Sequence, residues 1–210
     1  MPKVLPFIEY VKEDKNPVID SPNAFYKLLM YKTEEYFNNP ESHVNFIKKV
    51  EHCVRTNDRY NKYIAYIKNE VKLDRCAVFK DINDDDATIE MHHGILDLFN
   101  ICDVVTQYFL LHKWKISTFI IADEVLSEHW KNHIPIVMVS TTVHQEIHAG
   151  NIFIPYQSFF GDFKAFIKKY NDAMSTEIKT IINRYIDKSL MKDSTDLSIL
   201  DLNPELKGGN

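Results

Sequence analysis

Two short strand-like runs interrupt a chain whose hydrophobic spacing is otherwise helical, and this limits the folds that the chain can adopt. Residues 88–92 alternate in polarity, and residues 136–139 are apolar throughout, as in a buried strand. Residues 76–79 also suit a strand, and the turn residues at 83–86 predict a β-hairpin between 76–79 and 88–92. The sequence therefore predicts an α+β fold that is mainly helical.

Capping residues and hydrophobic spacing predict the helices. Ser21-Pro22, Asn57 and Ser117 or Thr118 are typical helix starts, and Ser140 precedes a last short helix that stops at Gly150. A C-terminal amphipathic helix is expected at 158–192, either continuous or broken near Ser175. The other helices are expected over about residues 22–37, 41–55, 57–71, 98–109 and 118–130.

The length and composition are those of one compact unit. The chain has 210 residues, of which 45% are hydrophobic, enough for a packed core. No apolar run is long enough to span a bilayer, and the N-terminus lacks the pattern of a secretory signal. Cys53, Cys76 and Cys102 are widely spaced, which predicts reduced, buried thiols in a cytoplasmic protein. The expected regions are 1–74 (N-terminal and helical), 75–157 (core, with a helical insertion at about 95–133), 158–192 (C-terminal helix) and 193–210 (tail).

The charge distribution is more informative than the net charge of −5. Residues 44–75 contain eight basic and four acidic residues, and residues 164–192 are also rich in lysine. Solvated helix faces are the preferred explanation for these charges when they are considered alone. They indicate nucleic-acid binding only if another feature requires a phosphate partner.

Histidines provide such a feature, since seven of nine lie between positions 92 and 148. His144 and His148 are one helical turn apart, so both imidazoles can face one ion. His92 would be a third ligand and leave one position open, as in catalytic rather than structural sites. Ordinary core packing is the alternative for these histidines. His129 and His133 form a rival pair, for which packing or support of the site is the preferred interpretation.

The run Ile89-Glu90-Met91-His92-His93, followed later by Val143-His144-Gln-Glu-Ile-His148-Ala-Gly150, resembles the ββα-metal motif of HNH endonucleases. The resemblance is closest to the His-rich form of colicin-type DNases. It covers about residues 79–150, with the helices at 95–133 as an insertion between the two halves. Asn132 is the nearest counterpart of the middle Asn in the family name.

The resemblance implies a metal-dependent endonuclease acting on DNA. His92, His144 and His148 would hold one divalent metal ion, and imidazole ligands favour zinc or another transition metal over magnesium. His93 would be the general base, and Glu90 would orient a ligand. A composition rich in Lys, Asn, Ile and Tyr resembles that of phage proteins or of proteins from AT-rich bacteria, and a phage protein would act in the bacterial host. Residues expected to contact DNA are Lys62, Lys68, Lys72, Arg75, Lys168 and Lys169.

Two other functions fit the same residues. The first is a non-catalytic helical protein that binds DNA or protein and has a structural or vestigial metal site. The second is a hydrolase that acts on another phosphodiester. No membrane partner is expected, because the sequence has no membrane-spanning segment.

Overall fold

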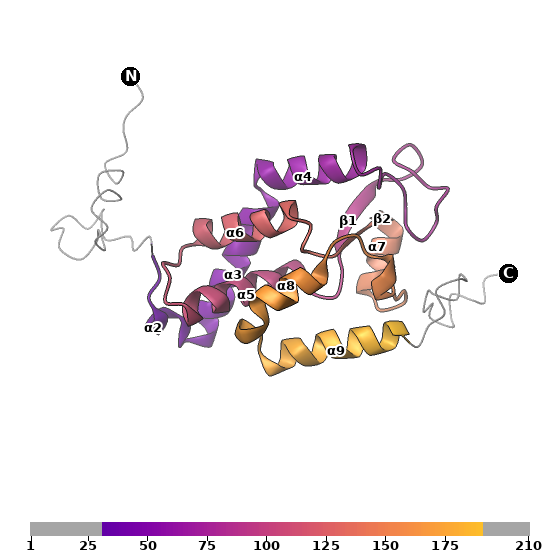
Figure 1. Cartoon of the computed structure of the whole chain (residues 1–210). Helices are drawn as coiled ribbons and strands as arrows, with labels where there is room; N and C mark the ends of the chain where they lie inside the picture. The colour runs from indigo at the N-terminus through magenta and orange to yellow at the C-terminus, as the bar shows by residue number, and fades with distance from the viewer. Residues whose placement is uncertain (1–30, 191–210) are drawn as a thin grey trace, which may run out of the picture.

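A computed structural model describes residues 31–190, which form a mainly helical protein with one two-stranded antiparallel sheet (Figure 1). The class is therefore the mainly helical α+β fold that the sequence predicts. In chain order the elements are α2 (Glu34–Phe37), α3 (Pro40–Arg55), α4 (Asp58–Asn69), β1 (Ile89–His93), α5 (Leu98–Leu111), α6 (Thr118–Trp130), β2 (Ile136–Ser140), α7 (Thr141–His148), η2 (Tyr156–Ser158), α8 (Phe163–Tyr170), η3 (Asn171–Ala173) and α9 (Thr176–Leu190).

The sheet pairs two strands that are far apart in sequence. β1 and β2 run antiparallel, with His92 opposite Val137 and Glu90 opposite Val139. All five residues of β2 are buried, as expected for an apolar run. The predicted hairpin between 76–79 and β1 is wrong. β2 takes the place beside β1, and it can bury more apolar surface there than the short 76–79 run could.

Residues 76–79 instead belong to a loop on the other edge of β2. The Cys76 N–H donates to the Ile82 carbonyl at 2.9 Å, so the loop closes on itself. The Ala77 N–H donates to the Met138 carbonyl at 2.8 Å, and this single bond fastens the loop to β2.

Most helix boundaries follow the predicted caps. The side chains of Asn57 and Ser117 accept backbone N–H groups at the starts of α4 and α6. Asp97, which the sequence pattern did not single out, caps α5 by accepting the Asn100 N–H at 2.7 Å. The first predicted helix starts at Ser21, outside the described residues. Within them it is not continuous, because Lys32 is extended and bridges Ile116 before α2 begins.

The C-terminal region contains two helices, so the continuous alternative is wrong and the break near Ser175 is correct. α8 ends at Tyr170, and η3 and an extended Met174 separate it from α9. The Ser175 hydroxyl accepts the Ile178 N–H at 3.3 Å, which starts the new helix. The predicted tail, 193–210, lies outside the described residues.

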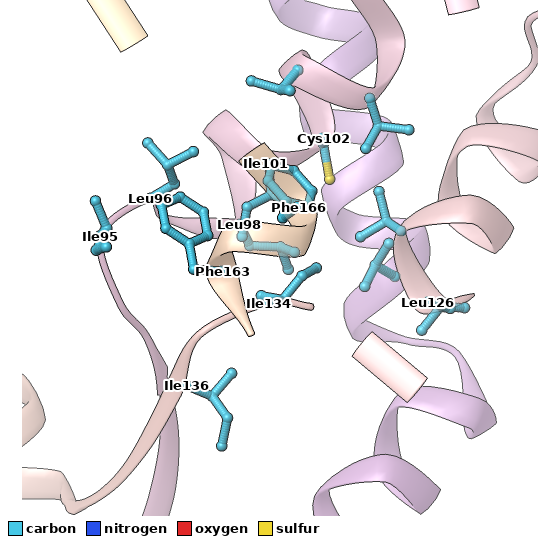
Figure 2. Close-up of a cluster of buried hydrophobic side chains, with 14 of the residues drawn as sticks. Ile95, Leu96, Leu98, Ile101, Cys102, Leu126, Ile134, Ile136, Phe163 and Phe166 are labelled. Atoms are coloured by element: carbon cyan, nitrogen blue, oxygen red, sulfur yellow. The ribbon is translucent and has the colours of Figure 1, made fainter. Parts of the chain in front are cut away.

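One hydrophobic core joins the helices to the inner end of the sheet. α3 packs against α5 and α6, which also contact each other. Phe163 and Phe166 of α8 lie beside Leu98 and Ile101 of α5 (Figure 2). Cys76 and Cys102 are buried and Cys53 is half-buried, and all three are free thiols, as predicted. Among the described helices, none is both long and apolar enough to cross a membrane.

A buried carboxylate ties α6 to α8. Glu128 is fully buried and accepts from Lys131 at 3.0 Å, His133 at 2.7 Å and Lys169 at 2.8 Å. Burial alone would raise the pKa of Glu128, but the hydrogen bonds from Lys169, His133 and Lys131 outweigh burial and lower it to about 2. The carboxylate is therefore ionised and fully paired in the folded protein.

We expect Glu128→Gln to destabilise the fold by about 3 kcal/mol at pH 7, since it removes the buried charge that pairs with Lys169 and Lys131. The pKa of Glu128 is lower in the folded state than its ordinary 4.5. Its contribution to stability is therefore complete above pH 4.5 and is lost as the pH falls toward 2. Urea unfolding across this range should show a shallower pH dependence for the variant.

Glu51→Gln is the matched control. Glu51 pairs with Arg55 at 2.8 Å on the surface of α3, so its loss should cost less than about 1 kcal/mol. Equal effects of the two substitutions would contradict the importance of the buried network.

Candidate metal centre

Three histidines from β1 and α7 converge on one point. Ligand nitrogens of His92, His144 and His148 all lie within 4.8 Å of one another. β1 presents His92 toward α7, and the one-turn spacing on α7 places His144 and His148 side by side. The ring centroids of His92 lie 5.0 Å from those of His144 and 5.2 Å from those of His148. The structure thus brings together all three predicted ligands.

A carboxylate fixes the orientation of one of these rings. Glu90 Oε2 lies 2.6 Å from His144 Nδ1, and Thr141 Oγ1 donates to Glu90 Oε1 at 3.2 Å. The bond from His144 is the main reason why the pKa of Glu90 is lowered. An ionised Glu90 makes Nδ1 of His144 the protonated nitrogen, which leaves the lone pair on Nε2. This is the contact that a ligand-orienting carboxylate makes in metal sites.

The donor set fits a transition-metal ion. His144 Nε2 lies 3.1 Å from His148 Nε2. Zn–N bonds of about 2.0–2.1 Å in tetrahedral geometry place two ligand nitrogens about 3.4 Å apart. A small rotation of the two side chains therefore suffices for both to bind one ion. His92 would complete three nitrogen ligands, and the described residues add no cysteine or carboxylate to this cluster.

The third ring is already neutral. Burial, with the nearby His144 and His148 imidazoles, lowers the pKa of His92 to about 4. Metal binding therefore requires no loss of a proton from His92 at pH 7. His148 is exposed, so one side of the cluster is open to solvent and to a substrate.

His93 lies on the opposite face of β1, away from the three ligands. It is buried, its ring stacks with that of Tyr60, and its Nε2 lies 3.0 Å from His129 Nε2. His129 Nδ1 donates to the Val125 carbonyl at 2.8 Å, so His129 Nε2 accepts and His93 Nε2 donates. In this arrangement the Nε2 proton of His93 points toward α6 and away from the three-histidine cluster. The geometry therefore does not favour His93 as the general base, a role that stays a prediction.

The second pair of histidines, His129 and His133, makes two different contacts. His129 is fully buried against His93, whereas His133 contacts Glu128. The sequence favoured packing or support of the site for this pair, and the contacts of His129 agree with that interpretation. Asn132 ends α6 with φ 56°, and its side chain accepts from Tyr63 at 3.3 Å. The described contacts of Asn132 do not include the metal cluster.

The residues predicted to contact DNA fall into two groups. Lys68 is bound to Asp84 at 2.9 Å, and Lys169 is half-buried between Glu124 and Glu128. These two lysines are neutralised within the fold, so both are poor candidates for a phosphate contact. The remaining predicted residues are exposed, namely Lys62, Lys72, Arg75 and Lys168.

The fold and the cluster define a mainly helical protein with a three-histidine candidate metal centre between a strand and a helix. The family model of the Bacteriophage G278-like virion proteins matches residues 5–203, so the chain belongs to that family. This family agrees with the phage-like character that the composition indicated. No curated protein and no solved structure matches the chain.

We expect the wild-type protein to bind one zinc ion and His144→Ala or His148→Ala to lose it. Glu90→Gln keeps the size of the side chain but weakens its hydrogen bond with His144, so the zinc affinity should fall about 10- to 100-fold. Competition with a chromophoric chelator measures these affinities.

His112→Ala is the control for the loss of an imidazole. His112 follows α5 and contacts the Tyr108 carbonyl at 2.8 Å, so this variant should retain zinc. Zinc binding by His148→Ala with wild-type affinity would rule out the three-histidine site.

Proposed function

We propose that the protein is a metal-dependent endonuclease of the HNH type that hydrolyses DNA phosphodiester bonds. The observation that carries the proposal is the convergence of His92, His144 and His148 with Glu90 bonded behind His144. The order of β1, antiparallel β2 and α7, with α5 and α6 inserted between the strands, supports the proposal, because strand, strand and helix follow one another in the ββα-metal motif.

The chain's own residues would perform three tasks. His92, His144 and His148 would hold a divalent ion, which supplies Lewis-acid chemistry at a phosphoryl oxygen when it is bound. Glu90 keeps the Nε2 lone pair of His144 directed at the centre of the cluster. The exposed position of His148 leaves room for the scissile phosphate to approach from solvent.

Proton removal from the attacking water is assigned to His93 by the resemblance. A general base must reach that water within about 3 Å, or through one intervening water. His93 would have to exchange its contact with His129 for one on the substrate side of β1. Substitution of His93 tests this requirement.

The family description supports a second candidate. A virion protein can be a non-catalytic component of the particle, and the three histidines would then hold a structural or vestigial ion. Structural zinc sites usually have four closed ligands that include cysteine. The cluster here has three histidines and an exposed side, which favours the catalytic alternative.

Nicking of supercoiled plasmid DNA tests the activity. We expect cleavage by the purified full-length protein with zinc or manganese, none with excess chelator, and none by His148→Ala. Circular dichroism checks that each variant is folded. A folded, metal-loaded wild-type protein that never cuts DNA would favour the virion component.

Two substitutions at His93 separate catalysis from packing. His93→Gln can still donate an N–H to His129, but an amide cannot act as a general base. If His93 is the base, both His93→Gln and His93→Ala bind zinc and lose cleavage. Cleavage by folded His93→Gln would show that His93 supports the strand and that another group removes the proton.

A further inference from the structure

A basic cavity lies on the outer edge of β2, on the other side of that strand from β1. Its volume is about 470 Å³. Lys72, Arg75 and Lys80, from the loop between α4 and β1, line one part of it. Phe159 and Phe160, which follow η2, line another part. The cavity thus combines three cations with an aromatic wall.

The three cations are available to an anion from outside. Lys72, Arg75 and Lys80 are exposed, and no ion pair of theirs occurs within residues 31–190, in contrast to Lys68 and Lys169. Asp74 and Asp81 are in the same loop, but no acidic residue lines the cavity. Its charge therefore complements a phosphate.

Lys72 follows α4 in a left-handed backbone conformation. The Leu73 N–H donates to the Ile67 carbonyl at 3.1 Å, and Lys72 has φ 65°, so it occupies the left-handed position that ends α4. Glycine is the residue preferred at that position, because a side chain is strained there.

The cavity is close to the metal centre through the sheet. Val137 lines the cavity and is paired directly with His92. Neighbouring strands are about 4.8 Å apart, and one nucleic-acid strand advances about 3.4 Å per nucleotide in a helix. A strand bound at the histidines could therefore reach the cavity within a few nucleotides.

We propose that the basic cavity binds one nucleotide of a nucleic-acid strand whose scissile phosphate, a few nucleotides away, lies at the candidate metal centre. The phosphate of the bound nucleotide would contact Lys72, Arg75 and Lys80, and the base would pack against Phe160. Packing of a base on an aromatic ring tolerates any base, and phosphate contacts carry no sequence information. The subsite would therefore position a strand without selecting a sequence. This inference deepens the proposed nuclease function. It rests on that function only for the placement of the scissile phosphate at the candidate metal centre.

Fluorescence anisotropy with a labelled single-stranded DNA oligonucleotide and the full-length protein, in the presence of EDTA, tests the subsite. We expect Lys72→Gly, Arg75→Gln and Lys80→Gln each to weaken binding about fivefold. Each should also reduce the slope of log affinity against log salt by about one. Lys72→Gly is the most informative variant, because glycine suits the backbone there and the fold should be at least as stable.

Lys48→Gln and Lys49→Gln are matched controls. Both remove an exposed charge from α3, and neither lysine lines the basic cavity, so binding should change little. Phe160→Leu should weaken binding without altering the salt slope, since it removes aromatic contact and no charge. If the three cavity variants bind like Lys48→Gln, the subsite does not exist.

The failure of the subsite and that of the nuclease are distinguishable. If the cavity variants bind the oligonucleotide more weakly but the wild-type protein never cuts DNA, the subsite is supported and the nuclease function is contradicted. If the wild type and the cavity variants bind and cut DNA equally well, the nuclease function is supported and the subsite is contradicted.

Discussion

The pairing of β1 with β2 is the interaction on which the candidate site depends. It places Glu90 and His92 opposite Val139 and Val137, and β2 continues directly into α7. The N–H of Thr141, the first residue of α7, donates to the Thr88 carbonyl at 3.1 Å, which fixes the helix against the start of β1. A shift of the register by one residue would turn Glu90 and His92 away from α7 and put His93 in their place. The metal cluster is thus a consequence of strand register.

Strand alternation also separates the two adjacent histidines into different environments. His92 faces two other imidazoles near solvent, whereas His93 faces Tyr60 and His129 in the interior. An imidazole that is buried with its Nε2 bonded to another imidazole is held neutral, and burial is the main reason why the pKa of His93 lies well below its ordinary value. One dipeptide therefore serves both the candidate centre and the core beneath it.

Local signals predicted much of this structure. Asn57 and Ser117 marked their helices correctly. The spacing of His144 and His148 on one helix, with His92 on a strand, was sufficient to predict that these three side chains converge. The errors concern contacts between distant segments. The 76–79 run looked like the partner of β1 because it is close in sequence, but partner choice depends on which strand buries more apolar surface. The contact of His129 with His93 spans 36 residues and has no local signature.

The helices between β1 and β2 have a physical reason to be there. An isolated two-stranded sheet is at best marginally stable in water, so β1 and β2 need a surface to pack on. α5 and α6 form much of the hydrophobic core, and α6 supplies His129, which bonds His93 directly beneath the strand that carries His92. Buried Glu128, the neighbour of His129, then ties α6 to α8 through Lys169. The segment that looks like an insertion in the sequence is therefore the support that holds β1, and with it His92, in position.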